Sequence, residues 1–391
     1  MSKVKKIPRF VKISYFVFVN LFAAIGLVFV AVFFAIRLKI TDVSGTVDDL
    51  SQQFQTQNES YQVQGVSTSS AELTNIDQQI QSLTQSRELK INNLCALNEL
   101  SYVAPQNVKK IIAVQNQSTS DELISKMIFA VETHLSNQDE FNQSLKNCLK
   151  NFNPDLISLA QISSQIQYIN SQNIFVWPDK KEWADVSASI TKDKDVINKA
   201  AAVAKIEPRH IVSSLIVEQL RLFYSQRELY KKYFEPLKIL ANSNKISLGV
   251  MAIKEETAAA VEAHLKDSNS PYYLGPEFAH ILDYPDNTDA ASLRYERLTR
   301  NDHYYNYLYG ALYLKQMMTQ WEKAGYDISK RPEIIGTLFN VGFPQSKPNA
   351  NPKVGGSTVK IDQTNYTFGR LAYEFYFSGE LVDIFPYTWA N

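Results

Sequence analysis

An uninterrupted apolar segment near the N-terminus constrains this chain more than any other feature. From Ile13 to Ile36 the sequence is almost wholly apolar, and only Ser14, Asn20 and Gly26 interrupt it. As an α-helix, the segment would be roughly 36 Å long at about 1.5 Å per residue, which exceeds the roughly 30 Å thickness of a membrane's hydrocarbon core. We therefore predict a transmembrane helix over residues 13–36.

The charges on either side of this segment predict its orientation. Residues 1–12 contain five basic residues and no acidic residue, whereas only Arg37 and Lys39 follow the segment closely. The positive-inside rule then places the N-terminus in the cytoplasm and the chain from about residue 40 outside. The segment is longer than the roughly 7–15-residue apolar core of a signal peptide, and no small-residue cleavage site follows it. We expect an uncleaved single-pass anchor in the cell membrane, with an extracytoplasmic C-terminal domain.

The overall composition favours a folded protein and excludes some partners. The chain has 391 residues, 45% of them hydrophobic, which suffices for a sizeable core. Its 40 basic and 40 acidic residues give a net charge of zero, so we expect no nucleic acid partner. The five histidines and two cysteines show no metal-ligand spacing, and no glycine-rich phosphate loop is present, so we expect neither a metal nor another cofactor.

Residues 37–87 are predicted to form a polar linker and a helical stalk. Small polar residues dominate 41–70, which is typical of a flexible tether. An apolar 3-4-3 spacing then runs from Leu73 to Leu83, but it covers only about two heptads, fewer than a coiled coil needs. We expect a helical stalk that could support self-association of the chain.

Residues 88–175 show helical periodicity throughout and predict a small all-α module. Ser120 precedes two acidic residues and fits a helix N-cap. The two cysteines, Cys95 and Cys148, both lie in this module on the external side of the membrane, where a disulfide is permitted. The sequence leaves two possibilities open, a bridge between them or two buried free thiols. The stretch 174–186, with two tryptophans and a proline, predicts the end of the module.

A helix predicted from Arg209 to Phe223 contains the most informative residue, Glu218. Glu218 follows Ile211 by seven residues and Leu215 by three, and it precedes Leu222 by four. At these spacings the carboxyl group shares a helix face with three aliphatic side chains. An apolar environment disfavours ionisation of a carboxyl group, and a protonated carboxyl group is what a general acid needs. The structural alternative is a rim carboxylate on an amphipathic core helix.

Four segments in this order resemble the lytic transglycosylase branch of the lysozyme-like superfamily. That family has a helix with the catalytic Glu, a Gly-Leu-Met-Gln segment running into a Thr-Ala helix, a Gly-Ala-x-Tyr-Leu helix and an Ala-Tyr-Asn-Ala-Gly turn. The matching stretches here are Val217-Glu218-Gln219, Gly249-Val250-Met251-Ala252 running to Thr257-Ala258, Gly310-Ala311-Leu312-Tyr313-Leu314 and Leu338-Phe339-Asn340-Val341-Gly342.

The resemblance implies a mostly α-helical, lysozyme-like domain over residues 183–345, in a chain whose overall class is all-α. It implies a membrane-anchored enzyme that cleaves the β-1,4 bond between N-acetylmuramic acid and N-acetylglucosamine in peptidoglycan strands. Glu218 would be the single catalytic acid and base. Substrate contacts would come from Gln219, Ser247, Gly249, Met251, Asn340 and Tyr309.

Departures from the family pattern leave a second function open. Gln219 replaces the usual Ser, Ala252 replaces the Gln of the Gly-Leu-Met-Gln segment, and Phe339 replaces the Tyr before Asn340. The missing polar groups are compatible with a non-catalytic scaffold that binds glycan strands in a cell-wall or secretion complex. The long spacing before Gly249 predicts an insertion over residues 224–244.

Two further expectations concern the regions after Gly249. Asp283 and Asp286 could supply a second carboxylate, although turn residues beside Pro285 are the simpler interpretation. The aromatic C-terminal extension, residues 346–391, is expected to be ordered and to pack on the domain.

Overall fold

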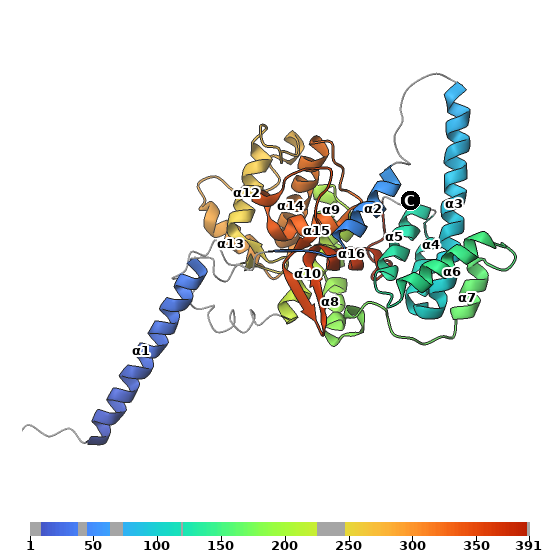
Figure 1. The fold of residues 1–391 in the computed structure, drawn as a ribbon. Coiled ribbons are helices and arrows are strands. Elements are labelled where there is room, and N and C mark those ends of the chain that lie inside the picture. Colours follow the sequence, from blue (N-terminus) through green and yellow to red (C-terminus); the bar gives the residue numbers. More distant parts are fainter. Residues whose placement is uncertain (1–8, 38–44, 63–72, 119, 225–246, 389–391) are drawn as a thin grey trace, which may run out of the picture. The chain divides into compact units, whose positions relative to one another are not determined.

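The computed structural model is mostly helical, as the sequence predicts: 64% of it is helix. It describes residues 9–37, 45–62, 73–118, 120–224 and 247–388 (Figure 1). The basic segment 1–8, parts of the predicted linker and the predicted insertion from residue 225 onward lie outside these ranges. The chain divides into two compact units, one containing the N-terminal helix and the other beginning at Gly45.

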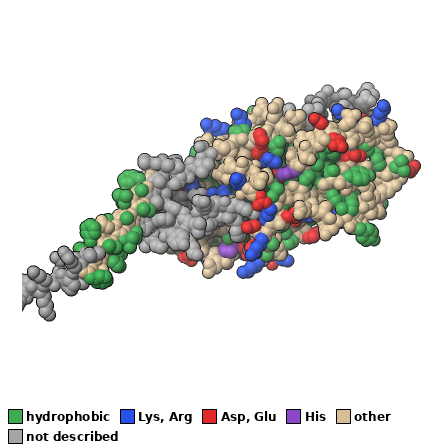
Figure 2. Space-filling model, turned by 60° about the horizontal axis from the view of Figure 1, so that its bottom comes forward, with side chains coloured by type: hydrophobic (Ala, Val, Ile, Leu, Met, Phe, Trp, Pro, Cys, Tyr) green, Lys and Arg blue, Asp and Glu red, His purple; other side chains and the backbone are tan. Residues whose placement is uncertain are grey.

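The first unit contains the helix α1, Arg9–Arg37, which includes the whole predicted segment 13–36. Large apolar side chains of α1 such as Phe16, Phe22 and Leu27 are exposed, and Figure 2 shows apolar side chains along this helix. Across the part of the chain that the structure describes, no helix combines the length and apolar character required to cross a membrane. The anchor over residues 13–36 stays a prediction.

The second unit begins with a helical region built around the long helix α3. The predicted stalk from Leu73 onward is the first part of α3, and α4, α5, α6 and α7 all pack against its later part or against each other. The Ser120 hydroxyl accepts a hydrogen bond from the Leu123 N–H at 3.3 Å, which confirms the predicted N-cap. A disulfide joins Cys95 of α3 to Cys148 of α6, one of the two alternatives that the sequence leaves open. The helices are α3 Leu73–Val103, α4 Pro105–Gln115, α5 Asp121–Glu132, α6 Gln138–Lys150 and α7 Leu159–Ile166.

Helix α10, Pro208–Tyr224, packs against α8, α9, α14, α15 and α16, whereas α12 and α13 pack against α14. The strands are short and form three antiparallel pairs in the described residues, including the hairpin in which Val359 of β5 faces Tyr366 of β6. The helices are α8 Lys181–Lys192, α9 Lys194–Ala204, α12 Glu255–Lys266, α13 Ala290–Thr299, α14 Tyr304–Lys323, α15 Pro332–Val341 and α16 Phe368–Phe377. The strands are β2 Ser247–Leu248, β3 Ile253–Lys254, β4 Gly355–Gly356, β5 Thr358–Ile361 and β6 Thr364–Thr367, and short 3₁₀ turns are η1 Trp177–Asp179, η4 Pro276–Phe278 and η5 Phe343–Gln345.

Residues 45–57 are not the flexible tether that their polar composition predicts. The strand β1, Thr46–Val47, pairs antiparallel with β4, and α2, Ser51–Gln62, follows it. The Thr367 hydroxyl donates to the Asp48 carboxylate at 2.8 Å. The Phe54 ring is buried and lies 4.8 Å from the Tyr373 ring, centroid to centroid. The prediction of a tether is wrong for residues 45–57, because the Phe54 ring and the buried Asp48 carboxylate attach an otherwise polar segment to the core.

The C-terminal extension contributes to the centre of the second unit. It was expected to pack on the domain, and nearly all residues of α16 are indeed buried. The Arg209 guanidinium of α10, itself fully buried, donates to the backbone oxygens of Phe375, Tyr376, Glu380 and Phe385 at 2.7 to 3.1 Å. The guanidinium thus joins the last turn of α16, at Phe375 and Tyr376, to the tail that follows it, at Glu380 and Phe385.

The residues assigned to the module 88–175 and to the domain 183–345 share one hydrophobic core. His134, just after α5, lies 2.6 Å from the Glu374 carboxylate of α16, and Phe129 packs edge-on against Tyr373. Figure 2 shows positive and negative side chains interspersed over this unit, in keeping with the net charge of zero.

Candidate functional site

The helix predicted from Arg209 to Phe223 is present as α10 and buries the face expected to be apolar. Ile211 is 0% and Leu215 is 2% exposed, and Glu218 on the same face is only 5% exposed. The side chain of Leu222 lies outside the described residues. Glu218 is therefore a nearly buried carboxyl group on a core helix, as its position in the sequence predicts.

Glu218 nevertheless has a charged partner, which the sequence reasoning missed. Arg221, one turn later on α10, donates its Nε–H to Oε2 of Glu218 at 3.0 Å and its Nη2–H to the same oxygen. The i, i+3 spacing of an acid and a base on one helix could have indicated this pair. A charged group without a partner is costly to bury, and the Arg221 guanidinium supplies a partner for Glu218 on its otherwise apolar helix face.

Gln219 connects α10 to the turn that follows the undescribed segment. Its side-chain amide donates to the backbone oxygen of Val250 at 2.6 Å. This turn joins β2 to β3, and the N–H of Ala252 donates to the oxygen of Gly249 at 3.1 Å. Gly249 has φ +66°, and a Cβ at this position would lie 2.2 Å from the Asn306 side chain, so only glycine fits.

Asn306 on α14 holds the same turn and is a site residue that the sequence reasoning did not identify. Its side-chain oxygen accepts the N–H of Met251 at 2.6 Å, and its amide nitrogen donates to the oxygens of Leu248 and Leu298, each at 3.1 Å. Asn306 is 1% exposed. A lone amide among the aromatic and aliphatic residues 304–314 was the available signal, since buried polar groups need partners.

Met251 packs closely on Gly310 of α14. A Cβ on Gly310 would lie 2.9 Å from the terminal carbon of Met251. Met251 itself is 0% exposed, so in this structure its side chain belongs to the core rather than to a sugar-binding surface. The predicted substrate contact through Met251 is therefore corrected.

Tyr309, also predicted to contact substrate, is fully buried and has a different role. Its hydroxyl donates to the Glu262 carboxylate of α12 and lies 3.0 Å from the Tyr284 hydroxyl. Arg294 donates to both oxygens of Glu262, at 3.0 and 2.7 Å. Burial and hydrogen bonding to Glu262 raise the pKa of Tyr309. A ring buried in this way cannot stack on a sugar, so this prediction is also corrected.

Asn340 orders the segment after β4. Its side-chain oxygen accepts hydrogen bonds from the N–H and the hydroxyl of Ser357, at 2.8 and 3.0 Å. The helix α15 ends at Val341, and Gly342 with φ +91° caps it, where the resemblance places a turn. For Ser247 the structure gives only the backbone pairing with Lys254, because its side chain is not described.

The alternative second carboxylates lie at the protein surface. Asp283 forms ion pairs with Lys266 and His280, each at 2.7 Å, and hydrogen bonds from both side chains lower its pKa. Asp286 is exposed. Both residues follow the simpler interpretation of the sequence, as parts of a solvated turn.

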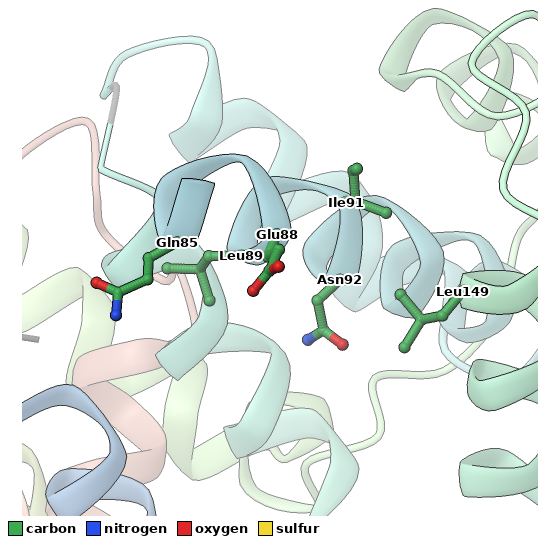
Figure 3. Close-up of a pocket in the computed structure, with 6 residues that line it drawn as sticks. All are labelled: Gln85, Glu88, Leu89, Ile91, Asn92 and Leu149. Carbon is green, nitrogen blue, oxygen red and sulfur yellow. The ribbon is translucent and has the colours of Figure 1, made fainter. Parts of the chain in front are cut away.

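A surface pocket lies on another part of the unit, between α3 and α6 (Figure 3). The pocket is lined by Gln85, Glu88, Leu89, Ile91, Asn92 and Leu149.

Within the described ranges, no group of three or more His, Cys, Asp or Glu side chains could hold a metal ion.

Comparisons with protein-family models, with curated proteins and with solved structures find no match to this chain.

Proposed function

We propose that this protein is a membrane-anchored peptidoglycan lytic transglycosylase with Glu218 as its acid and base. The observation that carries the proposal is the junction of α10 with the turn 249–252. Glu218 lies on α10, and its neighbour Gln219 bonds to Val250 in the segment that resembles the family's Gly-Leu-Met-Gln motif. Asn306 of the aromatic helix α14 holds the same turn, and α15 packs against both α10 and α14. The four segments of the resemblance thus lie on elements that pack against one another.

The proposed reaction needs a single carboxyl group. Protonated Glu218 gives its proton to the glycosidic oxygen as the C1–O bond breaks, and the substrate's own N-acetyl oxygen stabilises the positive charge that develops at C1. The Glu218 carboxylate then removes the proton of the muramic 6-hydroxyl, and the 6-oxygen bonds to C1. The products are a shortened strand and a 1,6-anhydro end, with no net consumption of water.

The proposal includes residues 13–36 as the membrane anchor and places the second unit on the cell-wall side. The support is the apolar character of this segment, its basic N-terminal flank and the exposed apolar side chains of α1. The Cys95–Cys148 disulfide supports the same placement, because disulfides persist in oxidising compartments.

The scaffold that binds glycan strands without cleaving them remains the second candidate, and the ion pair of Glu218 with Arg221 favours it. A carboxylate that accepts two hydrogen bonds from a guanidinium has a structural role that requires no proton transfer. The buried Tyr309 and Met251 supply no polar contacts to a sugar in place of those missing from the family pattern.

One assay separates the two candidates. The full-length protein in detergent is incubated with purified peptidoglycan, and the soluble products are identified by mass spectrometry. The enzyme releases anhydro-muropeptides, each lighter by one water than the hydrolysis product, and Glu218→Gln, shown to be folded by its cooperative thermal unfolding, abolishes their release. Co-sedimentation with peptidoglycan and no soluble product would instead support the scaffold.

A further inference from the structure

The proposed reaction requires a proton on Glu218, and the contact with Arg221 stands in its way. Both the Nε–H and the Nη2–H of Arg221 point to the same oxygen, Oε2 of Glu218. A proton on that oxygen would have to displace these two donors, because a protonated carboxyl oxygen is itself a donor. In this structure Oε2 of Glu218 is the acceptor of both donors from Arg221.

Arg221 is the partner of the two that can move. Its side chain is 14% exposed, twice the 7% of Glu218, and it lies in the last turn of α10. A guanidinium on a long side chain can turn toward solvent, whereas the short side chain of Glu218 is fixed on the buried face of the helix. A partner exchange at this site would accordingly involve Arg221.

The geometry of the pair indicates what would attract Arg221. Two N–H groups share one oxygen of Glu218, whereas the fork of a guanidinium is best matched by a carboxylate that accepts on both oxygens. A carboxylate on an incoming ligand is free to adopt the two-oxygen arrangement. Such a ligand would replace the Glu218 carboxylate without leaving the guanidinium unpaired.

We propose that Arg221 is a specificity-determining residue that selects glycan strands with a carboxylate substituent near the bond to be cleaved. The substrate carboxylate takes the Arg221 guanidinium, and Glu218 takes a proton from solvent water and becomes the acid. The charges balance, because one carboxylate replaces another beside Arg221 while Glu218 becomes neutral. This inference rests on the proposed function, but its binding step can be measured without any cleavage.

Calorimetric binding to the full-length protein in detergent tests the exchange. The probes are a soluble peptidoglycan tetrasaccharide with free peptide carboxylates and the same fragment with its carboxylates converted to methylamides. Wild type binds the free-acid fragment more tightly than the amidated fragment. Glu218→Gln binds the free-acid fragment roughly tenfold more tightly than wild type does, because the competing charge is gone, and binds the amidated fragment unchanged.

The decisive variant is Arg221→Gln, which binds the two fragments equally. Arg300→Gln, an exposed arginine paired with Asp302, is the matched control and keeps the wild-type preference. Thermal unfolding shows whether each variant is folded. An unchanged preference in folded Arg221→Gln, an unchanged affinity in Glu218→Gln, or no measurable binding of either fragment overturns the proposal.

Cleavage gives a separate result. If wild type releases no product but binding follows the expected pattern, the proposed enzyme function fails and the selection by Arg221 stands. If wild type cleaves both fragments at the same rate and Arg221→Gln leaves this ratio unchanged, Arg221 does not select the substrate although the enzyme is active.

Discussion

The backbone N–H of Met251 donates to the side-chain oxygen of Asn306 over 2.6 Å, and both residues are buried. This bond joins the turn after β2 to the first turn of the aromatic helix α14. Since Gln219 of α10 bonds to Val250, one residue earlier, the turn is held from two helices at once. Its position relative to Glu218 therefore depends on two side-chain amides.

Asn306→Ala should destabilise the protein by about 2–4 kcal/mol. The substitution leaves the Met251 N–H and the oxygens of Leu248 and Leu298 without their partners in a buried site. Chemical denaturation followed by circular dichroism measures the loss. Asn142→Ala, at an exposed position of α6, is the control and should change stability by less than about 0.5 kcal/mol. Equal effects of the two substitutions would contradict the role given to Asn306.

Gly249→Ala and Gly325→Ala form a matched pair that separates backbone strain from steric overlap. Both glycines have positive φ, +66° and +85°. A Cβ on Gly325 meets nothing within 4 Å, whereas a Cβ on Gly249 would lie 2.4 Å from the Leu298 oxygen. Gly325→Ala should cost about 1 kcal/mol, and Gly249→Ala at least about 3 kcal/mol. Thermal unfolding of the two variants measures the loss of stability in each. A smaller loss for Gly249→Ala than for Gly325→Ala would refute the packing described for this turn.

Arg209→Met should destabilise the protein by about 3–5 kcal/mol. Methionine fills much of the space but removes the guanidinium donors from four backbone oxygens at the end of α16 and in the tail. Urea denaturation gives the magnitude, and limited proteolysis should show earlier cleavage after residue 377. Arg87→Met, on the exposed face of α3, serves as the control. A variant as resistant as wild type would show that the tail is held by other contacts.

Glu132 at the end of α5 should make stability fall as pH rises. Burial raises its pKa from 4.5 to about 7. Between these values the unfolded chain has lost the proton and the folded chain keeps it, so stability decreases from about pH 4.5 to 7 and stays reduced above. Glu132→Gln should be more stable than wild type at pH 8, by on the order of 1–3 kcal/mol, and equally stable at pH 4. Melting temperatures measured from pH 4 to pH 8 test this prediction, with a substitution at an exposed position, Glu296→Gln, as the control. If the melting temperatures of wild type and Glu132→Gln changed with pH in parallel, the prediction would be contradicted.

Periodic apolar residues and local signals were enough to predict several elements. The helix with Glu218 and the Ser120 cap follow from spacing and from residue chemistry within one turn. These features depend on neighbours along the chain, which a sequence displays directly.

The sequence alone determined a mostly helical chain with an apolar N-terminal segment and a nearly buried carboxylate at residue 218. Only the tertiary structure decided that Phe54 attaches a polar segment to the core, that the Tyr309 hydroxyl donates a hydrogen bond to Glu262, and that Asn306 holds the turn beside α10. Each of these contacts joins residues 47 or more positions apart. Helical periodicity reports which face of an element is buried, but the partner that covers a buried polar group is set by how distant elements pack.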